Sequence, residues 1–569
     1  MLHALQDLLF DSRFDDLHHP WVKVFCGDVF RYRDGLSLVE RAELGYRRVR
    51  AINGEIASAE ELASDPERLI ALHEWAGFVD GTLASQANIH YNLFLGSVLD
   101  LDRERTVDLA PFAALERYGT ILITETGFGN NAADLETTAT YQHETGTFDL
   151  HTPSPRARKF MPNAGATGGP KSGLVAARLV VRGEDCGVFL FLVPLTGTPG
   201  VTVDPMPEKP GFALDNSITS FEHVTLPRSA FLGGDHGTLT EDGEFRSTIA
   251  NRRRRFLRSV QRVTAGKLCL SAAGAGAMRG AVAIAIRYAH QRQTFASTGK
   301  GTVPIFDYRC NQTRLLGALA TAYAGTALLR SATRRLVGRG ESDALEVDNL
   351  ISVAKGWLTW RTREVLIECR ERCGAQGLLS VNRIVDALLP TEGAITAEGD
   401  NLVIWSKAGA DMLIGRGYRP PTVDTAVISL QDNDSLLALL MWHERYRHRF
   451  ARTRLRRPAS NRWNNAVNPA LDLVDAHATR LAAQSLLTAA RGTTGTARAA
   501  LDLTFRLFAL QRLAPHTGVL LAEGHLTADQ VRGLAAEIDA VAEQLAPHAL
   551  TMVDAFAIPD DLLQAPIAG

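Results

Sequence analysis

The spacing of apolar side chains changes twice along this chain of 569 residues. Up to about residue 115, apolar positions recur every three or four residues, which predicts helices. Between about 116 and 235 the pattern alternates, with Gly and Pro between the runs, and predicts strands. After about residue 245 the helical spacing returns and persists to the end. The predicted order is therefore helices, then a sheet, then helices again.

Local signals mark where several of these elements begin and turn. Ser64-Asp65-Pro66 is typical of a helix start, because proline is tolerated in the first turn. The alternating segments turn at residues 144–146 and 183–185, and a further alternating segment covers residues 217–226. These positions predict antiparallel strand pairs in the middle of the chain.

The later helices also carry end signals. Gly374 follows the long amphipathic stretch "EVDNLISVAKGWLTWRTREVLIECRERC" at the place of a C-terminal cap. Thr527 and Gln530 have the spacing of a capping box at a helix start. The basic, aperiodic stretch 452–470 contains Pro and Asn and predicts a linker between helical domains.

Taken together, the pattern predicts an α+β protein that is mainly α and is built from separate blocks. We expect an N-terminal helical domain at 1–115, a central β domain at 116–240, a helical bundle at 241–440 and a C-terminal helical domain at 441–569. A chain of this length has room for several domains of ordinary size.

Composition narrows the choice of partners. The formal net charge is −2, so the basic surplus of a general nucleic-acid binder is missing and we expect no nucleic-acid partner. The six cysteines are scattered except for Cys369 and Cys373, and no cysteine or histidine set has the spacing of a metal site. We therefore expect reduced, structural thiols and no bound metal.

The apolar stretches and the chain ends favour a cytoplasmic protein. The run at 268–286 is interrupted by Arg279 and is rich in Ala and Gly, which indicates a buried helix at a close helix contact rather than a membrane span. The N-terminus lacks the order typical of a signal peptide, and the C-terminal "APIAG" is no peroxisomal signal. We expect no membrane partner.

Two glycine patterns raise the question of nucleotide binding. "GAGAMRG", at 274–280, lies inside a helical run rather than after a strand, so close helix packing is the better interpretation. In "ITETGFGNNAADLETTATY", Thr124 offers a hydroxyl, and Gly127 and Gly129 leave backbone amides accessible to an anionic or ring-edge ligand. A tight turn explains this second pattern equally well, so both interpretations stay open.

Six arginines fall within "RRRRFLRSVQR" at 252–262. On a helix, Arg255, Arg258 and Arg262 would share one face. Such a face either pairs with carboxylates in solvent or holds the phosphates of a substrate, because the arginine fork matches phosphate oxygens. The chain has no motif of a serine hydrolase, a zinc protease or a P-loop.

The stretch "TAEGDNLVIWSKAGADML", at 396–413, places Glu398 beside Gly399, just ahead of an apolar helical run. A carboxylate at a helix start often only complements the helix dipole. It can also serve as a general base, which must lie close to the proton that it removes. The residues around Glu398, taken alone, favour the first interpretation.

Five stretches, in order along nearly the whole chain, resemble segments of the acyl-CoA oxidases, which belong to the acyl-CoA dehydrogenase superfamily. They are "TETGFGNNAADLETTATY", "ARKFMPNAGATG", "IRYAHQRQTF", "ERCGAQGLL" and "MVDAFAIPDDLL". The step of 25 residues from Cys373 to Glu398 also suits the family. By this resemblance the chain is identified as a member of the acyl-CoA oxidase family.

The resemblance implies a fold, a cofactor and a reaction. The fold is acyl-CoA dehydrogenase-like, with an N-terminal helical domain, a central β-barrel domain, a helical bundle and an extra C-terminal helical domain. The protein is expected to bind FAD and to form at least a homodimer. Glu398 would be the catalytic base that takes the α-proton of an acyl-CoA while the β-hydride passes to flavin N5. The products would be a trans-2-enoyl-CoA and, from O2, hydrogen peroxide.

The resemblance also assigns binding residues. Those expected to hold FAD are Thr124, Gly127, Gly129, Asn163, Arg292, Phe295, Gly374 and Gly377. Of these, Arg292 and Phe295 would reach the flavin across the subunit interface. Those expected to meet the substrate are Asn130, Gly399, Arg255, Arg258 and Arg262, with the three arginines as candidate contacts to CoA phosphates.

Two other functions stay open. A dehydrogenase of the same superfamily would pass electrons to an electron-transfer flavoprotein, and the extra C-terminal domain favours the oxidase over it. A non-catalytic acyl-thioester-binding subunit would keep the fold, and the retained Glu398 argues against it. The carrier of the acyl group, CoA or an acyl carrier protein, and the length of the acyl chain also stay open.

Two departures from the family pattern predict which acyl chains the protein accepts. The aromatic pair after Lys159 is Phe160-Met161 here, and Ala397 stands where an aromatic residue is common. Smaller side chains at 161 and 397 leave room for a branched acyl chain. We predict that a branched acyl-CoA is oxidised faster than a straight-chain one of equal carbon number, measured as peroxide formation. Equal rates would contradict this prediction.

Overall fold

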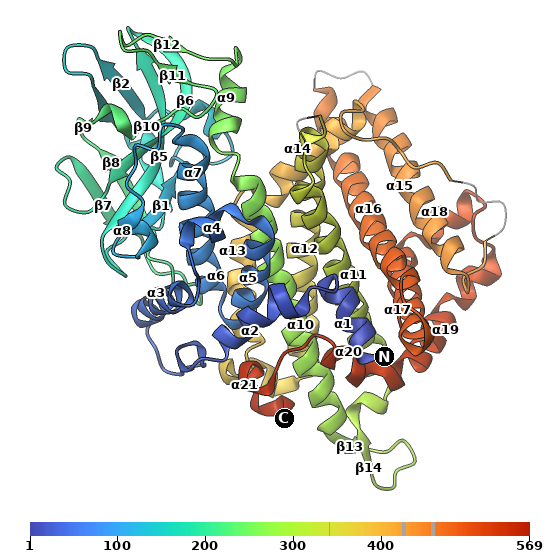
Figure 1. Cartoon of the computed structure of the whole chain (residues 1–569). Helices are drawn as coiled ribbons and strands as arrows, with labels where there is room; N and C mark the ends of the chain where they lie inside the picture. Colours follow the sequence, from blue (N-terminus) through green and yellow to red (C-terminus); the bar gives the residue numbers. More distant parts are fainter. Residues whose placement is uncertain (341, 424–427, 457–460) are drawn as a thin grey trace. The chain divides into compact units, whose positions relative to one another are not determined.

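The structure is a computed structural model in which two compact units are distinguished. The described residues are 1–340, 342–423, 428–456 and 461–569. The first unit, here called the helical unit, comprises 1–27, 70–80 and 270–569; the second, the mixed unit, comprises 28–69 and 81–269. Figure 1 shows the chain coloured from its N-terminus to its C-terminus.

Long helices that run side by side form the centre of the helical unit (Figure 1). They are α11 (Arg309–Val337), α12 (Ala344–Arg372), α16 (Arg462–Arg491) and α17 (Gly495–Leu513). In α11 nearly every side chain from 315 to 333 is buried, as expected of a helix surrounded by other helices.

Further helices and one hairpin complete the helical unit. The helices are α1 (Leu2–Phe10), α2 (His19–Phe25), α5 (Pro66–Val79, here from residue 70), α10 (Val263–Gln291, here from residue 270), α13 (Leu388–Thr396), α14 (Asn401–Leu413), α15 (Asn433–Arg456), α18 (Thr517–Ala522), α19 (Ala528–Leu545), α20 (Ala549–Asp554) and α21 (Asp560–Leu563). The hairpin pairs β13 (Gln293–Phe295) with β14 (Thr302–Pro304).

Small residues let α10 approach its neighbours closely. A side chain at Gly276 would overlap the carbonyl oxygen of Glu74 in α5, and one at Gly274 would press on Thr362 in α12. The interpretation of "GAGAMRG" as a helix-packing motif is thereby confirmed. Among the described residues, α10 alone is long and apolar enough to cross a membrane by length and composition, yet 83% of that apolar window is buried, which is usual for a core helix.

The mixed unit contains two larger β-sheets and several short helices. The seven-stranded sheet has the order β10-β6-β5-β2-β3-β9, with β1 also paired to β5, and the three-stranded sheet has the order β4-β8-β7. The strands are β1 (Tyr118–Leu122), β2 (Thr138–Gln142), β3 (Thr147–His151), β4 (Lys159–Phe160), β5 (Lys171–Val181), β6 (Glu184–Pro194), β7 (Val201–Pro205), β8 (Ser217–Phe221), β9 (Val224–Leu226) and β10 (Phe231–Leu232). A separate pair is β11 (Thr238–Leu239) with β12 (Phe245–Arg246).

Along the sequence, the helices of the mixed unit come before the first strand and after the last one. They are α3 (Leu38–Gly54), α4 (Ala59–Ser64), α6 (Gly81–Ala87), a π-helical segment (Asn88–Gly96), α7 (Ser97–Leu101), α8 (Ala110–Ala113) and α9 (Arg252–Ser259).

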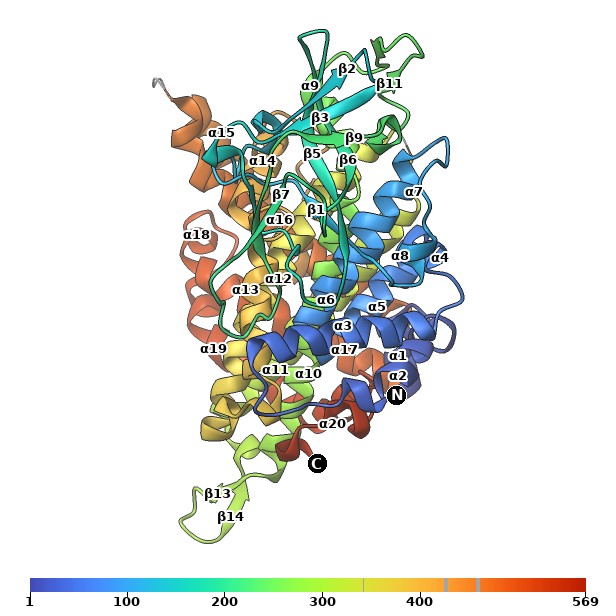
Figure 2. The same ribbon diagram turned by 90° about the vertical axis from the view of Figure 1, so that its left-hand side faces the viewer.

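The register of the larger sheet follows the apolar alternation. In the antiparallel pair β2–β3, Ala139 faces Leu150 and Tyr141 faces Phe148, and all four side chains are buried. Strand β5 pairs antiparallel with β6 and parallel with β1 and β2, so it is central (Figure 2). A strand covered on both faces is expected to be almost continuously apolar, as β5 is.

Several local predictions are confirmed. Helix α5 starts at Pro66, and β2 and β3 are joined by the predicted turn. Helix α12 ends just before Gly374, which has a positive φ of 57°. The side chains of Thr527 and Gln530 form the capping box of α19.

The stretch 452–470, predicted as a linker, is helical over most of its described length. Helix α15 continues to Arg456 and α16 begins at Arg462, while residues 457–460 lie outside the described residues. Pro469 lies inside α16, where the buried neighbours Ala466 and Ala470 hold the helix together by packing. Tertiary packing thus overrides the helix-breaking tendency that proline has in isolation.

The four predicted domains do not coincide with these units. The boundary between 440 and 441 lies within α15, and the predicted domain 1–115 contributes residues to both units. The strands of the mixed unit run from residue 118 to 246, close to the predicted β domain at 116–240. The mainly α, α+β class is confirmed, and the four-domain division stays a prediction.

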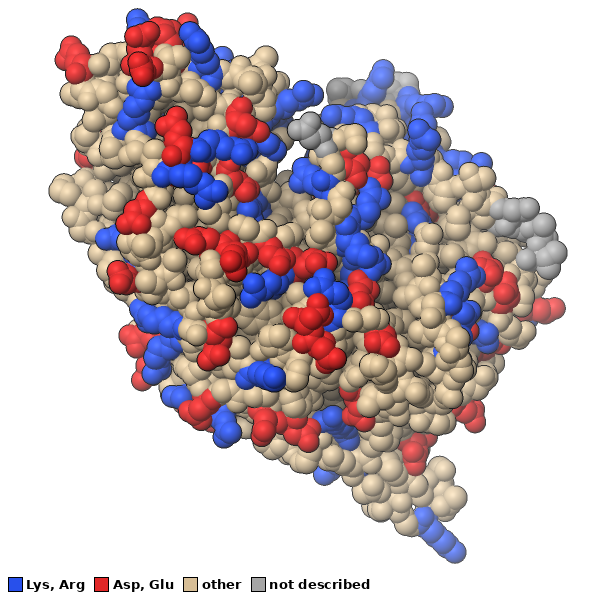
Figure 3. Space-filling model, viewed as in Figure 1, with Lys and Arg blue, Asp and Glu red and all other residues tan. Residues whose placement is uncertain are grey.

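Positive and negative side chains are interspersed on the face shown in Figure 3. This agrees with the formal net charge of −2.

A buried carboxylate with two guanidinium partners lies in the helical unit. Glu74 of α5 is fully buried and accepts hydrogen bonds from Arg330 of α11 through both oxygens, and from Arg279 of α10 at 2.6 Å. Burial alone would raise the pKa of Glu74, but the two arginines outweigh it and lower the pKa to about 2. Three helices therefore meet at one charge cluster.

Replacing Glu74 by Gln leaves both guanidinium groups without their counter-charge. We predict a loss of about 3–5 kcal/mol in the free energy of unfolding at pH 7, measured by urea titration. The surface control Glu55→Gln should change it by less than about 0.5 kcal/mol.

The same pair of proteins tests the pH dependence. Because the folded-state pKa of Glu74 is lowered, its stabilisation is complete above its ordinary pKa of 4.5 and is lost as the pH falls toward about 2. The stability difference between wild type and Glu74→Gln should shrink across this window, and a constant difference would contradict the assignment.

Candidate functional site

The segment 124–130, here called the 124–130 loop, is part of the connection between β1 and β2 in the mixed unit. It lies against residues 156–158, because the backbone N–H of Thr126 donates to the Arg158 carbonyl and that of Gly127 to the Arg156 carbonyl, both at 2.9 Å. A side chain at Gly127 would press on Arg156, so glycine is required there by close packing.

A buried ion pair fixes this loop to the strands beside it. Lys159 of β4 and Glu125 are both fully buried, and the Lys159 ammonium donates to Glu125 Oε1 at 2.9 Å. The Glu125 oxygens also accept the backbone N–H groups of Glu136 and Thr137, at 2.7 and 2.9 Å. Burial lowers the pKa of Lys159 to about 8, and Glu125 opposes that shift. The pair thereby ties the loop, β4 and the start of β2 together.

The solvent-exposed side of the 124–130 loop has two exposed apolar side chains beside it and an uncovered glycine within it. Phe160 and Met161 are 37% and 39% exposed, which is notable because large apolar side chains are usually covered. The Phe160 N–H donates to the Thr124 carbonyl at 2.9 Å, so the two residues are neighbours. Gly129 is exposed, with open space where a side chain would stand, and Asn130 beside it is also exposed.

Met161 is held in an unusual backbone conformation. Its φ is 66°, in the left-handed region that non-glycine residues seldom adopt. The Asn216 side chain donates to the Met161 carbonyl at 2.7 Å, and the Met161 N–H donates to the Ser217 carbonyl at 3.0 Å. The edge of the smaller sheet thus fixes the exposed pair at 160–161.

Asn163 lies behind this surface rather than on it. It is 5% exposed, and its amide donates to the Tyr46 hydroxyl oxygen at 2.7 Å. Tyr46 in turn donates to Asp215, whose other oxygen pairs with the buried Lys171. Burial raises the pKa of Tyr46 well above its ordinary value, and Asp215 adds to the shift. A contact from Asn163 to FAD stays a prediction, because the structure gives its amide group an internal partner.

The arginines at 252–262 are engaged in internal contacts. Arg258 donates to Asp235 at 2.6 Å and Arg262 makes a two-pronged pair with Asp100 at 2.7 and 2.8 Å. Arg255 donates to the carbonyls of residues 249 and 186, at 2.6 and 2.7 Å.

The prediction that these three arginines share one helical face is wrong. Helix α9 ends at Ser259, so Arg262 lies beyond it, in the turn before α10. A role of Arg255, Arg258 and Arg262 toward CoA phosphates stays a prediction, and it would require these internal contacts to be shared or replaced.

In the helical unit, Glu398 occupies the short turn between α13 and α14. It is half-buried and has a φ of 57°, and Gly399 follows with a φ of 102°. A left-handed backbone at a non-glycine residue costs about 1–3 kcal/mol and persists only when its surroundings enforce it. Asp400 then caps α14, since its side chain accepts the Leu402 N–H at 3.0 Å.

The residues expected to reach a second subunit lie at the surface of the helical unit. Arg292 follows α10, and Phe295 ends β13, with 81% of Phe295 exposed. The β13–β14 hairpin projects from the end of α10 (Figure 1). Tyr308 donates to the Phe295 carbonyl at 2.5 Å and so anchors the base of the hairpin.

The two glycines of "ERCGAQGLL" have different environments. Gly374 is exposed, with open space around it and a positive φ. Gly377 is buried, and a side chain there would overlap the Arg370 carbonyl at the end of α12. Gly374 is therefore the accessible one, whereas Gly377 is required for the close return of the chain. Leu378 and Leu379, next along the chain, are at least half exposed.

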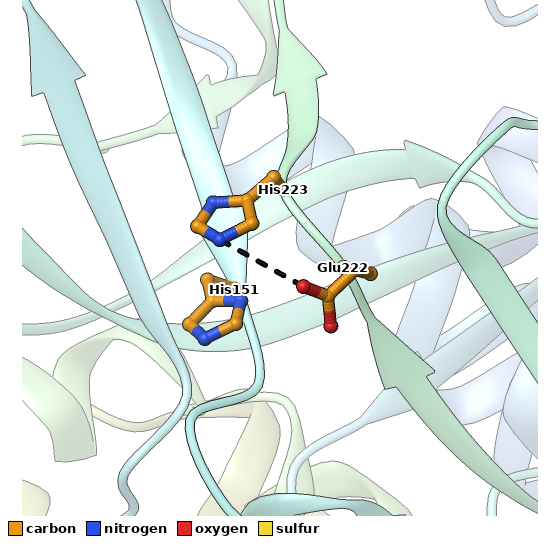
Figure 4. A group of neighbouring side chains, drawn as sticks. All are labelled: His151, Glu222 and His223. Atoms are coloured by element: carbon orange, nitrogen blue, oxygen red, sulfur yellow. Dashed lines mark ion pairs between the residues drawn. The ribbon is translucent and has the colours of Figure 1, made fainter.

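One group in the described residues has the ligand types of a metal site (Figure 4). His151 ends β3, and Glu222 and His223 lie between β8 and β9. The two imidazole rings are stacked, with 4.2 Å between centroids and 11° between planes, so their lone pairs do not converge on one point. A hydrogen bond to Asp149, at 3.0 Å, raises the pKa of His223. The arrangement favours imidazolium–carboxylate pairing, and we assign no metal to it.

Comparison with known proteins identifies the family. Residues 262–413 match the family model "Acyl-CoA oxidase, C-alpha1 domain", and residues 434–569 match "Acyl-CoA oxidase". Acyl-coenzyme A oxidase 2 (peroxisomal) of Arabidopsis thaliana is 27% identical over 558 residues, covering 89% of this chain and 80% of that one. Peroxisomal acyl-coenzyme A oxidase 3 of Homo sapiens is 28% identical over 590 residues, covering 94% and 84%.

Solved structures agree in fold. Acyl-CoA oxidase 1 of Yarrowia lipolytica has a TM-score of 0.88 at 20% identity, covering 100% of this chain and 90% of that one. Acyl-CoA oxidase-2 of Caenorhabditis elegans, bound with FAD, ascaroside-CoA and ATP, has a TM-score of 0.85 at 19% identity, covering 100% and 90%. The chain therefore has the mainly α, α+β fold of the acyl-CoA oxidases, as predicted.

The chain belongs to the acyl-CoA oxidase family. Its class is therefore that of an oxidoreductase acting on acyl-CoA, as the sequence predicts. The predicted cytoplasmic location is wrong, because the relatives are named peroxisomal. The terminal residues were a weak basis for it, since such addresses are read by receptors and leave no trace in the fold.

Replacing Glu125 by Gln removes the counter-charge of the buried Lys159. We predict a loss of about 3–5 kcal/mol in the free energy of unfolding, together with faster amide exchange at residues 136 and 137. Asp134→Asn, which neutralises an exposed carboxylate nearby, is the matched control and should leave both unchanged. Unaltered exchange in Glu125→Gln would show that the pair does not anchor the loop.

Proposed function

We propose that Glu398 is the general base of this acyl-CoA oxidase and removes the α-proton of the acyl-CoA thioester. The observation that carries the proposal is the enforced turn at 398–399, which holds a half-buried carboxylate ahead of a capped helix. Strained backbone of this kind is concentrated at functional sites. The spacing of 25 residues between Cys373 and Glu398, which suits the acyl-CoA oxidase family, supports the same assignment.

The chemistry requires a base in a fixed place. An α-proton of a thioester is a very weak acid, so the carboxylate must approach it closely and the carbonyl must be polarised. In the proposed arrangement the backbone N–H of Glu398 donates to the thioester oxygen, so one residue supplies both groups. Desolvation by a bound acyl chain then strengthens the carboxylate as a base, which outweighs the opposing influence of the α14 N-terminus.

The residues of the 124–130 loop fit FAD. The exposed Phe160 and Met161 offer apolar cover for a ring system, and the loop beside them has an exposed glycine at Gly129. FAD is bound in the Caenorhabditis elegans oxidase of the same fold, which supports the same cofactor here. When bound, FAD supplies the acceptor for the β-hydride and the route to O2. Thr124 and Gly129 would hold its polar edge, whereas the expectation of an open amide at Gly127 is wrong, because that N–H is donated to the Arg156 carbonyl.

A homodimer is part of the proposal. Phe295 is 81% exposed on a projecting hairpin, and Leu378 and Leu379 are exposed beside Gly374. Burial of these side chains against a second copy of the chain would remove apolar surface from water, which supports the dimer. In the proposed dimer Arg292, Phe295 and the accessible Gly374 meet the flavin of the partner subunit. Asn130 and Gly399 are proposed to contact the substrate.

The oxidase is favoured over the two alternatives. The match of residues 434–569 to the acyl-CoA oxidase model supports it over a dehydrogenase that uses an electron-transfer flavoprotein. The retained carboxylate at 398, held in an enforced turn, supports an enzyme over a non-catalytic acyl-thioester-binding subunit.

The test is a visible spectrum of the purified protein with a medium-chain acyl-CoA. We predict that the flavin is bleached without air, that its colour returns in air, and that peroxide forms. Glu398→Gln should slow the bleaching by about 10²–10⁴-fold, the range of general-base catalysis. Glu392→Gln, an exposed carboxylate on α13, is the matched control and should bleach at the wild-type rate. A Glu398→Gln protein as fast as wild type would exclude Glu398 as the base.

A further inference from the structure

Lysine 355 is a fully buried cation in the middle of α12. Its ammonium donates to the Ile395 carbonyl, the Gly399 carbonyl and the Asn401 side-chain oxygen, each at 2.9 Å. The first acceptor precedes Glu398 in the chain and the other two follow it. The hydrogen bonds of one ammonium group therefore link the two sides of the turn that carries Glu398, from the last part of α13 to the first residue of α14.

A second layer of hydrogen bonds holds this arrangement to α12. The Asn401 amide donates to the Thr359 hydroxyl at 3.0 Å, and the Thr359 hydroxyl donates to the Lys355 carbonyl at 2.8 Å. Nearby, the Trp405 indole donates to the Val353 carbonyl at 3.2 Å. Helices α12 and α14 are thus joined around Lys355, and α14 has little freedom to slide.

The choice of lysine follows from the shape of the site. An ammonium has three donors around one atom and can satisfy three oxygens that converge on a point, whereas the planar guanidinium suits paired oxygens of a carboxylate. A buried cation without such acceptors would be strongly unfavourable. The carbonyls of residues 395 and 399 are therefore kept in place, and with them the positive φ angles at 398 and 399.

We propose that Lys355 is a positioning residue that fixes the Glu398 carboxylate and backbone N–H in their working orientation. The proposal rests on the proposed function of Glu398. Lys355 acts on the turn through hydrogen bonds to residues on either side of Glu398.

Lys355→Met keeps the apolar stem and removes the three donors. We expect the rate of anaerobic flavin bleaching by an acyl-CoA to fall about 10²-fold, as for a misplacement of about 1 Å. The dissociation constant of the enoyl-CoA product should rise by less than about 10-fold, well below the loss in bleaching rate, because the Glu398 N–H and Gly399 are only part of its proposed contacts whereas the base acts on the α-proton alone. Independently of activity, hydrogen–deuterium exchange should rise in peptides covering 396–402 and stay unchanged in α16.

Thr362→Val is the matched control. Thr362 is fully buried on the same helix, two turns from Lys355, and its hydroxyl has no hydrogen-bond partner in the described part of the chain. The variant should match wild type in bleaching rate and in exchange of 396–402.

A double variant separates positioning from a general loss of structure. In the Glu398→Gln background, Lys355→Met should cost less than about 10-fold more, because no base is left to position and only the backbone N–H of residue 398 can still be displaced. A further loss of about 10²-fold there would overturn the proposal, as would a single variant within about 3-fold of wild type with unchanged exchange. If Lys355→Met does not fold, Thr359→Val decides, with an expected loss of about 5–10-fold and the same exchange signature.

The two proposals fail in different ways. If no acyl-CoA bleaches the wild-type protein, or if Glu398→Gln bleaches as fast as wild type, the proposed function fails. The exchange of 396–402 in Lys355→Met still reports whether the lysine holds the turn. Unchanged exchange would overturn the role of Lys355 whatever the activity of Glu398.

Discussion

The candidate functional segments of both units depend on one physical constraint, which is that a buried ammonium must be surrounded by oxygen acceptors. Lys159 meets it with Glu125 and the Ala176 carbonyl, and Lys355 meets it with the carbonyls of Ile395 and Gly399. Lys171 does the same with Asp215 and the Gly165 carbonyl. Each of the three lies beside an irregular segment that supplies at least one of its acceptors, namely Glu125, Gly399 and Asp215. If such a segment rearranged, the buried ammonium would lose oxygen acceptors that water cannot replace. The free-energy cost of that loss keeps the irregular backbone in one conformation.

This constraint explains how strain is tolerated at the two places where function is expected. Met161 and Glu398 both have left-handed backbones, and both stand next to segments held by a buried lysine. Met161 is exposed and Glu398 is half-buried, whereas Asn216 and Lys355, whose side chains hold these segments, are buried. Catalysis benefits from groups whose orientation is settled before substrate arrives, because no free energy is then spent on reorganisation in the transition state. In each segment the hydrogen-bonded groups that fix the backbone are buried, whereas Glu398 and Met161 are at least partly exposed.

How much the sequence alone could predict depends on how local each feature is. Pro66 and the pair Thr527–Gln530 signal helix starts through neighbours in sequence, and those predictions are confirmed. The end of α9 was missed because Ser259 carries no stop signal, and Arg262 was placed on a helix that had already ended. Lys355 stands in the apolar run "LISVAKGWLTW", where a lone charge is a sign of a buried cation. Its acceptors lie 40 or more residues away, so only the three-dimensional structure could show what it holds.

The chain has eight lysines among its 61 lysine and arginine residues, and three of the eight are the buried ones. Acyl thioesters transfer their acyl group to free amines, whereas the guanidinium stays protonated and does not react as a nucleophile. An amine that is buried and enclosed by oxygen acceptors is out of reach of such reagents. A protein of a family that handles acyl-CoA therefore fixes its key turns with amines that its own substrates cannot acylate.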